Sequence, residues 1–350
     1  MSVGTQDING LRVLLTGGTG YIGSHTAVAL KMAGCHVVLF DNLMNSEIEV
    51  LDRISRITGS RPAFVLGDVR NAALLKTLIH EERIDAVLHF AGSKAVGESV
   101  KQPLYYYDNN VAGTVSLVGA MQSAGLKRLV FSSSCTVYGT PRYLPVDELH
   151  PQSATNPYGR SKVFIEAILA DIAAADSSWQ ISCLRYFNPV GAHESGLLGE
   201  IPKGIPNCLM PYIARVATGE LPWVQVYGDD YPTSDGSGIR DYVHVMDVAE
   251  GHVAALRHLS FESNSGRQNL HCFNLGTGSG YSVLDMIRMF ELTSGKGIPY
   301  KFLPRRPGDV AEIFGDVRKA GVILNWHASR DLVQMCESLW KFQVNYCAQR

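Results

Sequence analysis

The sequence predicts an α/β fold with a doubly wound parallel sheet and a smaller, discontinuous carboxyl-terminal α/β lobe. Short apolar runs alternate with helical patterns between residues 13 and 185, as expected for a parallel sheet covered on both faces. The first run ends in glycines spaced G-x-x-G-x-x-G, at the point where such sheets bind ligands. Beyond residue 189 the chain is rich in glycine and proline, which is typical of the loops that build a pocket.

The domain boundaries follow from where these patterns change. Strand and helix patterns return at residues 240–258 and 270–275, and we expect these pieces to be shared with the sheet domain. The two predicted domains are residues 1–188 plus about 241–275, and residues 189–240 plus 276–350.

The segment after the first strand predicts a pyrophosphate site. Residues 13–15 form the apolar strand, and residues 21–33 carry apolar side chains at helical spacing. Gly17 and Gly20 would let the backbone approach a pyrophosphate, and Gly23 would let helix and strand pack closely. Ordinary tight turns also use glycine, so the triplet alone leaves this interpretation open.

The second strand supports a dinucleotide. The apolar run 35–40 ends in Asp41, at about the spacing where an acid accepts the hydroxyls of the adenine ribose. A carboxylate there repels a 2′-phosphate, and Asn42 follows with no arginine beside it, so NAD is favoured over NADP. The alternative is that Asp41 only stabilises a turn at the strand end.

Further strands are predicted at residues 63–66, 86–90, 129–131 and 181–184. Ligands of such sheets lie at the carboxyl ends of the strands, so the residues after each run are candidates for the site. These candidates are Asp68, Val69, Phe90, Ala91, Gly92, Lys94, Ser134, Tyr186 and Asn188.

Two long helices are predicted at about 104–124 and 158–174, and both have apolar residues on more than one side. One sheet covers only one side of a helix. We therefore expect a homodimer in which these helices form a four-helix bundle, with broader burial inside one chain as the alternative.

Composition excludes several classes of partner. The 350 residues carry 31 basic and 33 acidic side chains, a formal charge of −2, which does not indicate binding to nucleic acid or to a membrane surface. Seven scattered cysteines without a C-x-x-C pair indicate free thiols in a reducing compartment, so we expect a cytoplasmic protein. The sequence has no H-E-x-x-H motif, no signal-type segment and no apolar run near the ~20 residues of a membrane helix, so neither a metal nor a membrane is expected.

A tyrosine and a lysine supply the catalytic signal. Tyr158 and Lys162 lie four residues apart at the start of the second long helix, so they share one face. A cation about 4 Å from a phenol would lower its pKa from ~10 towards neutrality, which suits a general base. The alternative is a surface lysine beside a core tyrosine.

On these and further motifs, the chain resembles the extended short-chain dehydrogenase/reductase family, and within it the nucleotide-sugar 4-epimerases. Only the first ten or so residues fall outside the resemblance. The segments that carry it are 16–25, 89–99, 106–110, 132–139, 158–162 and 184–192. The resemblance implies a Rossmann-type domain that binds NAD, a UDP-sugar substrate, and an isomerase of galactose metabolism that interconverts UDP-glucose and UDP-galactose. Hydride would leave C4 for NAD, the 4-keto sugar would rotate, and hydride would return to its other face.

The resemblance also implies roles for single residues. Tyr158 would be the base, Lys162 would hold the nicotinamide ribose, and Ser134 would bond the reacting hydroxyl, although a serine at a strand end can also cap a loop. The implied NAD contacts are Tyr21, Ile22, Asp41, Asn42, Asp68, Val69, Phe90, Lys94 and Asn109. Two of these have plainer alternatives, a helix N-cap for Asp68 and a solvated loop charge for Lys94.

The implied substrate residues come mostly from the lobe. They are Arg240 and Arg306 for the phosphates, Asn188 and Leu209 as substrate contacts, Tyr227 near uracil, and Asp309 for the ribose. For each arginine a structural ion pair is the alternative.

The chain departs from the family pattern twice. Cys208 stands where an asparagine is usual, which removes an amide beside the substrate. Ile313 occupies the position whose size is associated with accepting or refusing N-acetylated sugars, and it leaves that choice open.

Rival functions remain at this point. A 4,6-dehydratase would need an acid and a base where Cys135 and Thr136 stand. A UDP-glucuronate enzyme would need a cation for the sugar carboxylate. An NAD-binding sensor without chemistry would not need Ser134, Tyr158 and Lys162 together.

Overall fold

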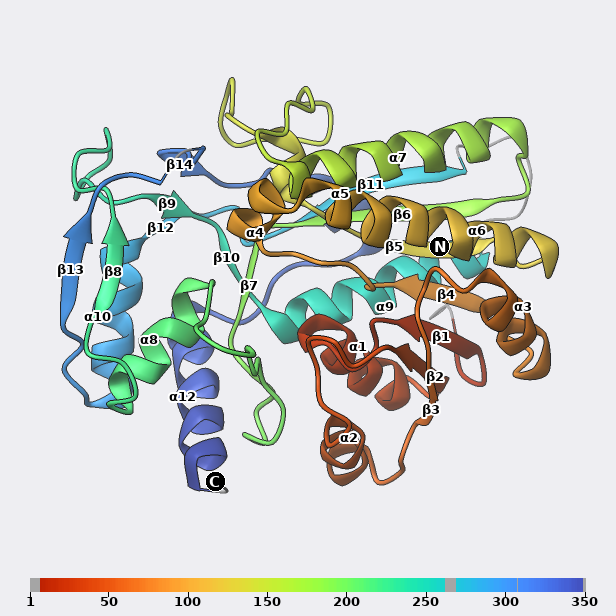
Figure 1. Cartoon of the computed structure of the whole chain (residues 1–350), viewed down its shortest axis with the longest axis horizontal. Helices are drawn as coiled ribbons and strands as arrows, with labels where there is room; N and C mark the ends of the chain where they lie inside the picture. The colour runs from red at the N-terminus through yellow and green to blue at the C-terminus, as the bar shows by residue number, and fades with distance from the viewer. Residues whose placement is uncertain (1–6, 262–268, 307, 349–350) are drawn as a thin grey trace.

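The computed structural model describes residues 7–261, 269–306 and 308–348, and the remaining parts of the predicted domains lie outside the described residues. Seven parallel strands form the main sheet in the order β11-β6-β5-β4-β1-β2-β3 (Figure 1). The strands are β1 (Arg12–Thr16), β2 (His36–Asp41), β3 (Ala63–Leu66), β4 (Ala86–His89), β5 (Arg128–Ser134), β6 (Gln180–Tyr186) and β11 (Leu270–Leu275). The predicted parallel α/β sheet is confirmed, and β1 lies between β2 and β4, where the strand order reverses.

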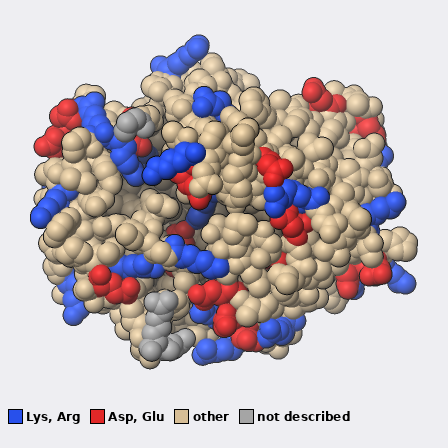
Figure 2. Space-filling model, in the orientation of Figure 1, with Lys and Arg blue, Asp and Glu red and all other residues tan. Residues whose placement is uncertain are grey.

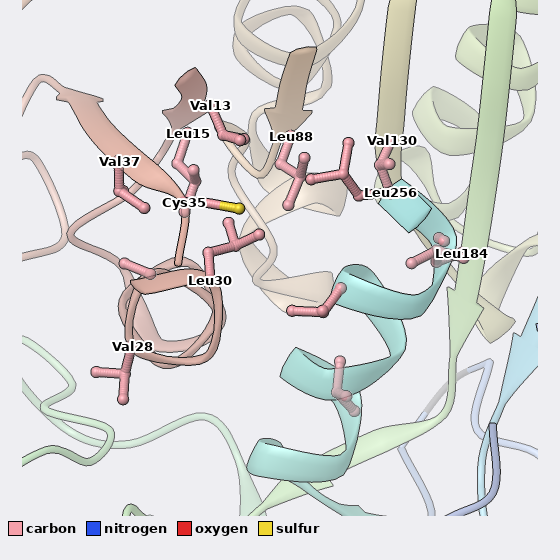
Figure 3. Close-up of a cluster of buried hydrophobic side chains, with 14 of the residues drawn as sticks. Val13, Leu15, Val28, Leu30, Cys35, Val37, Leu88, Val130, Leu184 and Leu256 are labelled. Carbon is pink, nitrogen blue, oxygen red and sulfur yellow. The ribbon is translucent and has the colours of Figure 1, made fainter. Parts of the chain in front are cut away.

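Helices cover both faces of this sheet. One face carries α1 (Tyr21–Met32), α2 (Val50–Thr58), α9 (Val245–Phe261) and α11 (Arg318–Leu324), and the other carries α3 (Ala72–Glu81), α6 (Gly113–Ser123) and α7 (Pro157–Ala175). Alternate strand residues serve the two faces: Val13 and Leu15 pack on the α1 side, whereas Leu14 packs on the α7 side. Figure 3 shows Leu15, Leu88, Val130 and Leu184 of the successive strands β1, β4, β5 and β6 with Leu30 of α1 and Leu256 of α9.

The predicted helix at 104–124 is divided in the structure. It consists of α5 (Pro103–Tyr106), the π-helical segment η1 (Tyr107–Ala112) and α6. The wider turns of η1 bury Asn110, whose Oδ1 accepts from the Ser93 N–H at 2.8 Å and whose Nδ2 donates to Ser161 Oγ at 3.1 Å. The interruption therefore ties the loop after β4 to α7, as π-segments at functional sites often do.

The smaller lobe has its own core and lies at one end of the main sheet (Figure 1). Its elements are α8 (Leu209–Ala217), α10 (Val283–Ser294), α12 (Leu332–Ala348), and the parallel pair β8 (Val224–Tyr227) and β13 (Tyr300–Leu303). Met210, Ile287 and Met335 from the three helices meet Val226 of β8 in this core.

Short strands connect the lobe to the sheet domain. They are β7 (Asn188–Val190) with β10 (Tyr242–His244), and β9 (Ile239–Arg240) with β12 (Tyr281–Ser282) and β14 (Glu312–Ile313). The helix α11 was expected in the smaller lobe, with the rest of residues 276–350. Its residues Ala320 and Leu324 instead pack into the core under the main sheet. The remaining short helices are α4 (Val96–Lys101), beside α5, and the 3₁₀ turn η2 (Cys135–Tyr138), directly after β5.

Candidate active site

The glycine turn after β1 has the geometry that a pyrophosphate needs. Gly17 has φ = 70°, and a Cβ there would lie 2.6 Å from the Ala91 backbone nitrogen. A Cβ on Gly23 would clash with the Gly17 carbonyl oxygen. The helix α1 begins at Gly20 without a side-chain cap, so its first N–H groups stay available to an anion. The residues present therefore fit a dinucleotide.

We expect Gly23→Ala to weaken this part of the fold. Overpacking of this kind costs about 1–3 kcal/mol, so urea unfolding should show that loss, together with weaker NAD binding in a fluorescence titration. The matched control is Gly119→Ala on α6, where a Cβ meets nothing within 4 Å and the stability should rise by up to about 1 kcal/mol. Equal stability of the two variants would contradict the close-packing role of Gly23.

The acid at the end of β2 stabilises the turn, which is the plainer of its two predicted roles. Asp41 accepts backbone N–H bonds from Thr19 at 3.1 Å and Leu43 at 2.9 Å, so it does stabilise the turn. Its carboxylate stays beside the glycine turn, where a ribose would lie. Asn42 caps the same turn through Met44 N–H at 3.0 Å.

The acid after β3 is not a helix cap. The Arg70 guanidinium hydrogen-bonds Asp68 at 2.6 Å and lowers the pKa of that carboxyl to about 2. The N-cap of α3 is Asn71. The side chain of Val69 is buried, and a Cβ on Gly113 would lie 2.6 Å from it.

The other predicted cofactor residues lie at the same edge of the sheet. Ile22 is in the first turn of α1, Phe90, Ala91 and Gly92 follow β4, Asn109 is buried in η1, and Tyr186 ends β6. The Phe90 ring packs on His252 of α9 at 4.7 Å between centroids. Tyr21 donates its hydroxyl to the Gly191 carbonyl at 2.7 Å, which links α1 to the segment after β7.

Ser134, Tyr158 and Lys162 meet where β5 ends and α7 begins. Asn156 caps α7 by accepting the Gly159 N–H at 2.9 Å, which places Tyr158 in the first turn. Lys162 is buried, and its Nζ donates to the Ser132 carbonyl at 2.7 Å. Ser134 acts on the Tyr158 phenol by lowering its pKa, and its Oγ accepts the Thr136 N–H at 3.2 Å and so caps η2.

The charge that acts on Tyr158 differs from the sequence expectation. Burial raises the pKa of Tyr158, and the hydrogen bond from Ser134 and the charge of Lys94 oppose this rise. The Lys162 ammonium is directed at the Ser132 carbonyl at 2.7 Å and lies 5.9 Å from the centre of the Tyr158 ring, and Lys94 rather than Lys162 is the cation that acts most on the phenol. Burial lowers the pKa of Lys162 itself to about 8.

The Lys94 side chain is 56% exposed, as expected for a solvated loop charge, and it also forms an ion pair. Its Nζ lies 2.6 Å from Glu200 Oε1 and 5.7 Å from the centre of the Tyr21 ring. Glu200 was not among the predicted residues, since a lone acid in a glycine- and proline-rich segment carries no local signal. The pair joins the loop after β4 to the smaller lobe at the edge of the site.

The predicted substrate residues form two groups. One group lies close to the catalytic cluster and consists of Cys208, Arg240 and Ile313. Ile313 is buried in the same cluster as Cys135. Burial raises the pKa of Cys135 to about 12, and the positive charge of Arg240 opposes this rise. Glu200 raises the pKa of Cys208, against the charges of Lys94 and Arg306. In Figure 2 the surface is hollowed between the two lobes, with charged side chains around the hollow.

The second group belongs to the smaller lobe. Arg306 pairs with Asp309 at 3.0 Å, so the structural alternative is present for this arginine, and its guanidinium lies 4.4 Å from the centre of the Tyr227 ring. Leu209 begins α8 directly after Cys208. Asn188, in β7, donates its backbone N–H to the Asp241 carbonyl at 3.0 Å.

Two absences concern the described part of the chain alone. No helix there is both long and apolar enough to cross a membrane. No group of three or more His, Cys, Asp or Glu side chains within residues 7–261, 269–306 and 308–348 is arranged to hold a metal ion.

This fold and site define a dinucleotide-binding enzyme of the short-chain dehydrogenase/reductase type, with a tyrosine and a lysine one helical turn apart beside a strand-end serine. The family model described as GDP-mannose 4,6 dehydratase matches residues 14–339, and the chain belongs to that family. Among curated relatives, it is 52% identical over 335 residues to the UDP-glucose 4-epimerase of Neisseria meningitidis serogroup C, covering 95% of this chain and 97% of the relative.

Solved structures give the same result. The UDP-glucose 4-epimerase of Stenotrophomonas maltophila, crystallised with NAD and formylated UDP-arabinopyranose, is 51% identical with a TM-score of 0.94 over 97% of this chain and 100% of that one. The UDP-glucose 4-epimerase of Bifidobacterium longum, crystallised with NAD⁺ and UDP, is 51% identical with a TM-score of 0.91, and the match covers 95% of this chain and 98% of that one. The family resemblance seen in the sequence is confirmed.

Proposed function

We propose that this protein interconverts UDP-glucose and UDP-galactose with NAD as its cofactor, by oxidising C4 of the sugar and reducing it again from the other face. The observation that carries the proposal is the meeting of Ser134, Tyr158 and Lys162 at the end of β5, beside the glycine turn. Relatives about 50% identical over nearly the whole chain, named UDP-glucose 4-epimerase, support it.

Each residue has a task that its position suits. NAD, when bound, supplies a nicotinamide ring that accepts and returns a hydride. Tyr158 takes the proton of the C4 hydroxyl and later gives it back, and Ser134 bonds the same hydroxyl. Lys162 orients the nicotinamide ribose, and the first N–H groups of α1 bind the pyrophosphate.

The residues after Ser134 favour epimerisation over dehydration. Water loss needs an acid and a base beside the sugar hydroxyl. Here Cys135 has a pKa raised to about 12 by burial, and the Thr136 hydroxyl is buried without a hydrogen-bond partner among the described residues. Neither side chain is a carboxylate, so these positions lack the acid and base pair that dehydration needs.

The two lobes divide the binding between them. We assign NAD to the sheet domain (residues 1–188 plus about 241–275, with α11) and the UDP-sugar to the smaller lobe. The phosphates are then bound by Arg240 and Arg306, whose guanidinium forks suit phosphate oxygens. Tyr227 lies against uracil and Asp309 against the ribose, while the Arg306–Asp309 pair uses only Nε of the arginine and leaves its two Nη groups to the phosphates.

The decisive experiment is an assay of purified protein with UDP-galactose and a coupled UDP-glucose readout. We expect interconversion without net consumption of NAD. Bound NAD without interconversion would overturn the proposal in favour of an NAD-binding sensor. A parallel reaction with UDP-GlcNAc then tests what Cys208 and Ile313 permit.

We further propose that the protein is a cytoplasmic homodimer. The seven cysteines lie within the described residues and none of them forms a disulfide there, as in a reducing compartment. Leu104 is 82% exposed, Val115 50% and Phe164 47%, so α5, α6 and α7 present an apolar surface that a second copy would cover as a four-helix bundle.

We expect Phe164→Glu to convert the dimer to a monomer in analytical ultracentrifugation, because it would bury unpaired carboxylates in the bundle. The matched control is Val322→Glu on α11, which is 85% exposed and remote from these helices, and which should stay dimeric. A dimeric Phe164→Glu variant would exclude the bundle as the interface.

A further inference from the structure

A buried ion pair lies directly behind the catalytic serine. Glu166 is on α7 one turn after Lys162, and Arg185 is on β6 next to Tyr186. Their side chains are 6% and 5% exposed, and Arg185 Nη2 lies 2.6 Å from Glu166 Oε2. Removing two charges from water is costly, so a buried pair calls for an account of what else it does.

The pair is the centre of a hydrogen-bond network. Glu166 Oε1 accepts from Ser133 Oγ at 2.5 Å, and Oε2 accepts from Gln152 Nε2 at 2.5 Å. Arg185 Nη1 donates to the Tyr138 hydroxyl at 3.1 Å and to the Glu148 carbonyl at 3.2 Å. The network therefore connects α7 and β5, on which the catalytic residues lie, with β6 and η2.

Strand geometry makes the contact with Ser133 important. Successive side chains of a strand point to opposite faces, so Ser133 faces away from the side that Ser132 and Ser134 share. Ser132 hydrogen-bonds Tyr186 on that side, and its carbonyl accepts from Lys162. Glu166 thus fixes Ser133, the middle one of three consecutive serines, and through the strand backbone it fixes the orientation of Ser134.

The charge of Glu166 also faces Lys162. Burial lowers the pKa of Lys162 to about 8, and Glu166 acts in the opposite direction. The other titratable groups around this ammonium are Tyr158 on α7, Cys183 on β6 and His89 on β4, whose pKa is lowered by burial and further by Lys162. Glu166 is the carboxylate among them.

We propose that Glu166, together with Arg185, is a positioning residue of the reaction: it fixes the strand end that presents Ser134, and it places a negative charge beside Lys162. It touches neither the sugar nor the cofactor. This inference deepens the proposed function and rests on it.

The test is Glu166→Gln, which keeps the shape and an acceptor for Ser133 but removes the charge. We expect the pKa of Lys162 to fall by about one unit or more. Turnover requires the charged lysine, so its loss at alkaline pH should begin about one pH unit lower than in the wild type. The first quantity is measured by NMR titration of ¹³Cε-labelled lysine, assigned with Lys162→Met, and the second by the pH–rate profile with UDP-galactose.

Two further variants separate positioning from folding. Glu166→Gln with Arg185→Gln leaves no lone buried cation, so stability should recover towards the wild type while the lysine pKa and the alkaline limb stay shifted. Glu166→Asp keeps the charge and should retain a near-native profile.

The outcomes are distinct. A lower melting temperature with an unchanged Lys162 pKa and an unchanged pH–rate profile, in both the single and the double variant, would make Glu166 structural only and overturn the inference. An inactive wild type would instead overturn the proposed function, and the NMR titration would still decide whether Glu166 acts on Lys162.

Discussion

Tyr158→Phe should lower epimerase turnover by at least about a hundredfold while NAD binding stays within about twofold of the wild type. The phenolic oxygen is the one atom lost, and a positioned general base contributes about 10²–10⁴-fold to a rate. The ring remains at the start of α7, so the fold around it should persist. The measurement is the coupled UDP-galactose assay, with bound NAD determined on the same preparation.

The matched control for this substitution is Tyr300→Phe, in which a tyrosine on β13 that is 44% exposed loses the same atom far from the site. Its turnover should equal that of the wild type. Near-normal turnover in Tyr158→Phe would remove the phenol as the base, whatever the control does.

Lys162→Met should have the second large effect: it should lower turnover, and it should remove the energetic cost of a buried charge from the folded state. Turnover should fall by at least about a hundredfold, because the group that orients the nicotinamide ribose is gone. The residual pH–rate profile should also change, because the buried ammonium, whose pKa is about 8, no longer titrates beside Tyr158. An unchanged pH–rate profile would contradict that charge effect.

The stability effect depends on pH in a defined direction. The folded-state pKa of Lys162 is about 8, against 10.5 for an ordinary lysine. Below about pH 8 the buried charge therefore lowers the free energy of unfolding by about 3 kcal/mol. Between about pH 8 and pH 10.5 the unfolded chain binds more protons than the folded one, so the free energy of unfolding rises and this loss disappears. In urea unfolding, the wild type should gain stability relative to Lys162→Met across this window.

The loss of the bond to the Ser132 carbonyl offsets part of the gain at neutral pH, by about 1–3 kcal/mol. The pH-dependent difference is therefore the sharper measurement. Lys76→Met is the control, because Lys76 is exposed on α3 and its removal should leave the pH dependence unchanged.

Patterns local in sequence predicted most of the fold. The strands predicted at residues 63–66 and 270–275 coincide with β3 and β11, the two edge strands of the main sheet. The helix at 104–124 was predicted without its π-segment, since periodicity does not report how Asn110 bonds Ser93 and Ser161.

The site was predictable where a motif lies in one stretch of chain. The glycine turn and the Tyr158–Lys162 spacing are of this kind, and the structure places the first directly after β1 and the second at the start of α7. The partners of Lys94 and Ser133 are not, because Glu200 is 106 residues from Lys94 and Glu166 is 33 residues from Ser133. Pairs that only the tertiary fold brings together leave no periodic signal in a single sequence.

The way the smaller lobe is attached constrains how the enzyme moves. The chain passes between the two cores at β7, at β10, after β11, and again on either side of α11. Multiple covalent connections oppose a wide hinge opening, unlike the single linker of many two-domain enzymes. The half-turn that epimerisation demands must then be made by the hexose itself, inside walls that stay nearly still.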